Sequence, residues 1–201
     1  MFRLIPLIIL LLSFNAFSQT IKVRAAKLGK AQIISGKASA VIDLSKDISG
    51  CLLIYDGTDP KLKKYDATGF NLLDSVRKNG AIYLVLVATS GGNCNVQGHC
   101  GATEDWTMIW LKLSNNLKVL DKKAVVVQSC HYGSIDLESI ELDKNDVQKP
   151  PKLVNGKLKI GYSENQYRED RDYIFHTLTY KKAEAEKGFT VKTEKRERPK
   201  N

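Results

Sequence analysis

Short runs in which apolar and polar residues alternate recur along the chain, and turn-forming residues separate them. Most runs are rich in β-branched residues, which is typical of strands. They lie at residues 20–26, 31–35, 39–44, 51–55, 81–90, 106–113, 124–130, 152–162 and 172–180. The pattern predicts a mainly β protein built of antiparallel sheets, arranged as a sandwich or as one strongly curved sheet.

The residues between these runs support antiparallel pairing. Asn155-Gly156 predicts a type I′ hairpin turn, because both central residues of that turn have positive φ, a conformation that Asn-Gly tolerates best. We expect a second turn at 114–116. Residues 187–188 are expected to turn the chain before a final short strand at 189–193.

One segment departs from the strand pattern. In residues 67–80, Phe70, Leu73 and Val76 are spaced three apart, and the segment ends in Asn79-Gly80. Apolar residues at this spacing followed by glycine indicate a short amphipathic helix with a glycine stop. We therefore expect one short helix in an otherwise β protein.

The run at 106–113 separates two kinds of face. One face carries Thr107, Ile109, Leu111 and Leu113, and the other carries Trp106, Met108, Trp110 and Lys112. Both faces are buried if the strand lies inside a sandwich, since large aromatic residues dominate cores. If the second face is open, Trp106 and Trp110 form a stacking platform for a sugar ring or a peptide.

The N-terminus resembles a secretory signal peptide. Arg3 precedes an apolar run at 4–12, and the small residues Ala16 and Ser18 follow, which places cleavage after Ser18. The apolar run is far shorter than the roughly 20 residues that span a membrane. We therefore expect an exported protein, periplasmic or secreted, with no integral membrane segment after cleavage.

Charge divides the remaining chain. Removal of residues 1–18 leaves 30 of the 31 basic residues against 22 acidic ones, a net charge of +8. Residues 21–37 contain five Lys or Arg and no acid, and residues 181–201 contain eight Lys or Arg and four Glu. We expect a single mainly β domain at 19–180 followed by a basic C-terminal hairpin or tail at 181–201. The basic ends either attract an anionic surface or keep an edge strand and a tail solvated.

Four cysteines, Cys51, Cys94, Cys100 and Cys130, form an even set. Cysteines of exported proteins usually oxidise, so disulfides that staple the fold are the default expectation. Three connectivities are possible. We favour Cys94 with Cys100, because the glycine-containing spacer can bend back on itself, and Cys51 with Cys130, because each borders an apolar strand.

Two other uses of these cysteines are weaker. A zinc site would use Cys94, His99, Cys100 and Cys130, with His131 beside them, but the five-residue spacer is wider than the usual zinc knuckle. A nucleophilic cysteine needs a histidine that meets it in space, which adjacency in the sequence does not indicate. We therefore expect no cofactor.

The function favoured by these features is binding. A stapled β scaffold that carries an irregular loop at 89–105 is a typical arrangement for recognition. The candidate contact residues are His99, Glu104, Trp106, Trp110 and His131. The expected partner is a protein, a glycan or an anionic surface outside the cytoplasm, and we do not expect nucleic acid. The alternative is an envelope or extracellular hydrolase, with or without zinc, that uses the Cys/His-rich loops.

Overall fold

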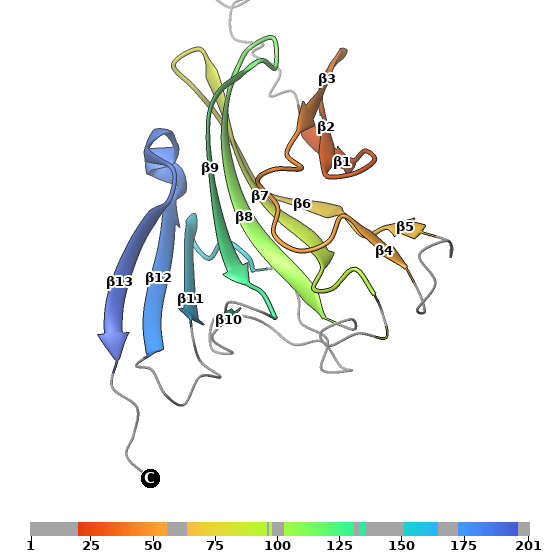
Figure 1. The fold of residues 1–201 in the computed structure, drawn as a ribbon. Helices are drawn as coiled ribbons and strands as arrows, with labels where there is room; N and C mark the ends of the chain where they lie inside the picture. Colours follow the sequence, from red (N-terminus) through yellow and green to blue (C-terminus); the bar gives the residue numbers. More distant parts are fainter. Residues whose placement is uncertain are drawn as a thin grey trace, which may run out of the picture.

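A computed structural model describes residues 20–55, 64–95, 97, 103–130, 133–135, 151–164 and 173–196. Within these residues the fold is mainly β and its strand ladders are antiparallel, as the sequence predicted. Three of the four sheets in this part of the chain lie side by side, with the central one between the N-terminal and C-terminal ones (Figure 1). The predicted signal peptide at 1–18 lies outside the described residues.

The sheets follow the order of the chain. The N-terminal sheet contains β1 (Ile21–Ala25), β2 (Lys30–Ser35) and β3 (Ala38–Asp43). The central sheet contains β6 (Gly69–Lys78), β7 (Ala81–Gly91), β8 (Glu104–Ser114) and β9 (Val119–Gln128). The C-terminal sheet contains β10 (Gly133–Ile135), β11 (Lys157–Glu164), β12 (Tyr173–Lys181) and β13 (Thr190–Arg196), and a small pair is formed by β4 (Leu53–Tyr55) and β5 (Lys64–Asp66).

The central sheet is covered on both faces, which explains why β7 and β8 are almost entirely buried. Toward the N-terminal sheet, its core side chains are Ile82, Leu84, Leu86, Ile109, Leu111 and Leu113, which pack with Ile33 and Ile42. Toward the C-terminal sheet, they are Tyr83, Val85, Val87, Trp106, Met108 and Trp110, which pack with Ile160 and Leu178. The two faces predicted for 106–113 therefore both belong to cores.

The helix predicted at 67–80 is wrong, because this segment forms β6. The pairing of β6 with β7 shifts between Leu72 and Asp74, so Leu73 is the extra residue of a β-bulge. Phe70 and Leu72 pack into one core, whereas Leu73 and Val76 pack against the other. The bulge thus produces a spacing of three along a strand, which imitates the period of a helix.

Turn chemistry was predicted better. Asn155 and Gly156 have φ values of 50° and 70°, and the flanking Val154 and Lys157 exchange two backbone hydrogen bonds, as a type I′ turn requires. The turn expected at 114–116 is present as well, closed by Ser114 N–H donating to the Lys118 carbonyl.

The short helical element of the described chain is a 3₁₀ helix, η3 (Lys182–Lys187), between β12 and β13. Ala185 and Phe189 are buried in the core between the central and C-terminal sheets. The indole Nε1 of Trp110 donates a hydrogen bond to the Ala185 carbonyl oxygen at 2.8 Å. The basic C-terminal segment is therefore attached to the core as far as β13.

The buried carboxylate of Asp74 also joins the central sheet to the C-terminal sheet. Asp74, on β6, accepts hydrogen bonds from the Tyr180 hydroxyl at 2.9 Å and from Lys182 Nζ at 2.7 Å. Burial, followed by the hydrogen bond and negative charge of Asp74, raises the pKa of Tyr180 well above its usual value. Tyr180 therefore stays protonated and remains a donor to Asp74.

Candidate functional site

A groove of about 430 Å³ lies at the edge of the central sheet and is formed by three separate parts of the chain. We call it the edge groove. It is lined by Lys46, Asp47, Ile48 and Ser49 after β3, by Val126, Val127, Gln128 and Ser129 at the end of β9, and by Tyr162 and Glu164 of β11. Its volume falls in the range typical of ligand sites.

The lining of the edge groove combines apolar and polar groups. Ile48 and Val127 are buried, whereas Val126 is 36% exposed. Gln128 Nε2 donates to the Glu104 carbonyl at 3.1 Å, and the buried Oε1 of Gln128 finds no donor among the described residues. The lining therefore combines aliphatic side chains with the amide of Gln128 and the carboxylate of Glu164.

Four side chains of the C-terminal sheet, those of Tyr162, Glu164, His176 and Thr193, meet beside the groove. The rings of Tyr162 and His176 are stacked with centroids 4.7 Å apart, and His176 Nδ1 lies 3.0 Å from Thr193 Oγ1. His176 Nε2 lies 3.3 Å from Glu164 Oε1, but not in hydrogen-bonding alignment. Burial, with a smaller contribution from the charge of Glu164, raises the pKa of Tyr162 to about 12. Its phenol is thus protonated at neutral pH.

A buried polar network holds the wall of the groove in place. Asp105 accepts hydrogen bonds from Ser49 Oγ at 2.8 Å and from the Cys130 backbone N–H at 3.3 Å. The Ser49 backbone N–H donates to Thr107 Oγ1 at 3.2 Å, and Ser90 Oγ donates to the Ser49 carbonyl. Because satisfied buried networks of this kind rigidify their surroundings, the segment at 46–49 is fixed to the central sheet.

The favoured cysteine pairing is wrong in both of its bonds, because Cys94 is bonded to Cys51. The Cys51 N–H donates to the Gly91 carbonyl at 2.7 Å, and the Gly91 N–H donates to the Cys51 carbonyl at 3.0 Å. This backbone pairing brings the two cysteines together across 43 residues of sequence. Cys130 is also disulfide-bonded. Cys100 lies outside the described residues.

The tryptophan platform is also wrong. Trp106 and Trp110 are only 2% and 1% exposed, because the C-terminal sheet covers their face of β8. Glu104 is exposed at the start of β8, where its carboxylate accepts a hydrogen bond from Trp106 Nε1 at 3.3 Å. His99 and His131 lie outside the described residues.

The zinc alternative loses one of its ligands. Cys94 has no free thiolate, since its sulfur is in a disulfide. Among the residues that the structure describes, no three His, Cys, Asp or Glu side chains are grouped as metal ligands would be.

Sequence reasoning missed the side chains that line the edge groove. Gln128, Tyr162 and Glu164 lie near strand ends, and Tyr162 and Glu164 are two residues apart, as residues on one strand face are. That alternation is the one local signal they carry. The approach of residues 46–49 to β9 and β11 depends on which segments the stacked sheets bring together, and local sequence patterns do not specify this.

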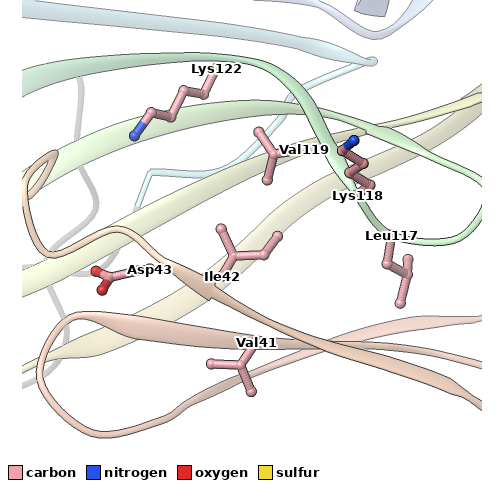
Figure 2. Close-up of a pocket in the computed structure, with 7 residues that line it drawn as sticks. All are labelled: Val41, Ile42, Asp43, Leu117, Lys118, Val119 and Lys122. Atoms are coloured by element: carbon pink, nitrogen blue, oxygen red, sulfur yellow. The ribbon is translucent and has the colours of Figure 1, made fainter.

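A second groove, of about 380 Å³, separates β3 from the turn that leads into β9. Figure 2 shows Val41, Ile42 and Asp43 on one side and Leu117, Lys118, Val119 and Lys122 on the other. We call it the β3–β9 groove. Lys122 Nζ forms an ion pair with Asp47 Oδ2 at 2.5 Å, and this pair links the two grooves because Asp47 lines the edge groove.

No helix among the described residues has the length and apolar character needed to cross a membrane. Comparisons of the chain with known protein families, with curated proteins and with solved structures found no match.

Proposed function

We propose that the protein is an exported, non-catalytic binding protein of the bacterial envelope or medium, and that it holds a partner protein or glycan in the edge groove. The observation that supports this most is the composition of the groove. Buried Ile48 and Val127 lie beside the amide of Gln128 and the carboxylate of Glu164. Such a mixture allows apolar contact together with directional hydrogen bonds.

The rigidity of the groove also supports binding. Ser49 is held by Asp105, Thr107 and Ser90. The Cys51–Cys94 disulfide lies directly after this segment. A site that is ordered before its ligand arrives spends less conformational entropy on binding, which favours affinity.

One contact favours the alternative, a hydrolase. The imidazole of His176 and the carboxylate of Glu164 lie within 3.3 Å of each other beside the groove. A carboxylate can orient a neighbouring imidazole for proton transfer, although this pair would first have to move into hydrogen-bonding alignment. A hydrolase would therefore lose turnover in a His176→Gln variant, whereas a binding protein would keep its capture of the partner.

The test compares two valines of similar exposure. Val126 lines the edge groove and is 36% exposed, whereas Val191 lies on β13 and is 39% exposed. The purified mature chain, Val126→Glu and Val191→Glu are used to capture partners from an envelope extract, and each is incubated with glycan and peptide substrates. We expect Val126→Glu to lose capture by at least about tenfold, since a partner in the groove would bury the new carboxylate without a paired charge, and Val191→Glu to retain it. Equal capture by both variants, or turnover of a substrate, would contradict the proposal.

A further inference from the structure

The outer face of the N-terminal sheet is strongly basic. Ala31, Ile33 and Ile42 are buried toward the central sheet, so the alternating positions of the same strands face away from it. Lys22, Arg24 and Lys30 are exposed on this outer face. Their cross-strand partners there are Ile34, Gln32 and Asp43.

Little negative charge balances these cations. Residues 20–46 contain six Lys or Arg and one acid, Asp43. The hydroxyl and the backbone N–H of Ser45 donate hydrogen bonds to Asp43, and with the nearby Lys30 and Lys46 they hold the pKa of Asp43 below its usual value. No ion pair joins Lys22 or Arg24 to another described residue. This face therefore carries a net positive potential.

Exposed aliphatic side chains lie among the cations. Val41 is 59% exposed on the outer face, and Leu28 is 41% exposed in the β1–β2 turn between Lys27 and Lys30. Leu28 has φ of +59°, a left-handed conformation that leucine rarely adopts.

The turn that presents Leu28 is held from the neighbouring strand pair. The Leu28 N–H donates to Asp66 Oδ2 at 2.8 Å, and the Gly29 N–H donates to Thr68 Oγ1 at 3.2 Å. Burial alone would raise the pKa of Asp66, but hydrogen bonds from Thr68 and Leu28 and the charge of Lys27 lower it overall. The carboxylate therefore stays ionised at neutral pH and keeps the exposed leucine in place.

We propose that this outer face and the β1–β2 turn dock on the surface of an anionic phospholipid bilayer. The cations would contact headgroup phosphates, while Leu28 and Val41 would reach the boundary of the acyl chains. An acidic polysaccharide would complement the charge but would offer nothing to the exposed aliphatic side chains. The β3–β9 groove borders the same surface, since Val41 on one of its walls faces Lys118 and Lys122 on the other (Figure 2).

This surface is not the edge groove. None of Lys22, Arg24, Lys30 and Leu28 lines that groove. Membrane docking and partner capture can therefore fail separately, and the variants that test one leave the other intact.

The experiment measures sedimentation of the mature chain with two kinds of vesicle, phosphatidylcholine alone and phosphatidylcholine with about 30% phosphatidylglycerol. We expect the protein to sediment with the anionic vesicles and not with phosphatidylcholine vesicles. This binding should be lost in 1 M salt, where the screening length falls to about 3 Å. Each Lys or Arg near an anionic surface contributes about fivefold in affinity, so Lys22→Gln/Arg24→Gln should weaken binding about 25-fold. Leu28→Ala should weaken it further at unchanged net charge.

The matched control is Lys157→Gln/Lys159→Gln on β11, which removes the same charge from two exposed lysines of the other outer layer. It should change vesicle binding by less than about twofold. The proposal is overturned if the anionic vesicles do not bind, or if the two double variants lose affinity equally. It is also overturned if Leu28→Ala has no effect while dextran sulfate binds more tightly than the vesicles, because the face would then serve a soluble polyanion.

Discussion

Gly188 offers the sharpest test of how the C-terminal segment is attached to the core. It follows η3 and has φ of 68° and ψ of −145°, a combination that is almost confined to glycine. A Cβ atom at this position would lie 3.0 Å from Cδ2 and 3.2 Å from Cε2 of Trp110. Trp110 is buried and hydrogen-bonded to Ala185, so its ring cannot move away.

Two costs add in Gly188→Ala. Forcing alanine into this backbone conformation costs about 1–3 kcal/mol, and inserting a methyl group into a packed core costs about 1–3 kcal/mol more. Gly80→Ala is the matched control, because Gly80 has φ of +71° and a Cβ atom added there would have no neighbouring atom within 4 Å. That control should lose only about 1–2 kcal/mol for its left-handed conformation.

Urea unfolding followed by tryptophan fluorescence measures both variants. We expect Gly188→Ala to lose about 2 kcal/mol more than Gly80→Ala in the free energy of unfolding. Equal losses would refute the reasoning, since they would mean that the turn at Gly188 does not lie against the Trp110 ring.

Three further predictions concern bonds within the fold. Cys51→Ser/Cys94→Ser should lower the free energy of unfolding by up to about 4 kcal/mol, which is the chain-entropy value for a separation of 43 residues. Peptide mapping of the native protein should recover the Cys51 peptide linked to the Cys94 peptide. Tyr180→Phe should cost about 1.5–3 kcal/mol in urea unfolding, because it removes a buried hydrogen bond to the Asp74 carboxylate; a cost below about 0.5 kcal/mol would argue against that bond. The pKa of Tyr162 is about 12 in the folded chain and about 10 in the unfolded chain, so the folded chain keeps this proton to a higher pH. The stability that Tyr162 contributes is therefore complete below pH 10 and is lost as the pH rises from 10 to 12. Tyr162→Phe should therefore flatten the pH dependence of unfolding between pH 10 and 12 by up to about 1.4 kcal/mol per pH unit, and an unchanged slope would contradict the shift.

Local patterns predicted most of the fold because strand alternation and turn chemistry are local properties. The Asn155-Gly156 turn and the strand at 106–113 follow directly from residue type and spacing. The failure at 69–78 is also physical. A one-residue bulge at Leu73 changes the face to which apolar residues point, and sequence spacing alone cannot distinguish that change from a helical period.

The candidate site was much less predictable than the fold. Cys51 meets Cys94 because their backbones are adjacent near Gly91, a relation that depends on long-range pairing. Trp110 is buried because the C-terminal sheet, whose strands β11 and β12 lie much further along the chain, covers it. The edge groove combines three segments that are distant in the sequence, so no local motif contains it.

The most direct test of partner binding in the edge groove is site-specific photo-crosslinking. A diazirine amino acid replaces Val126 in the groove or, as the control, Val191 on β13, two positions that are 36% and 39% exposed. Each mature chain is irradiated in an envelope extract, and adducts are identified by mass. We predict one discrete adduct from position 126 that is absent from position 191. The same adducts from both positions, or none from position 126, would contradict the account.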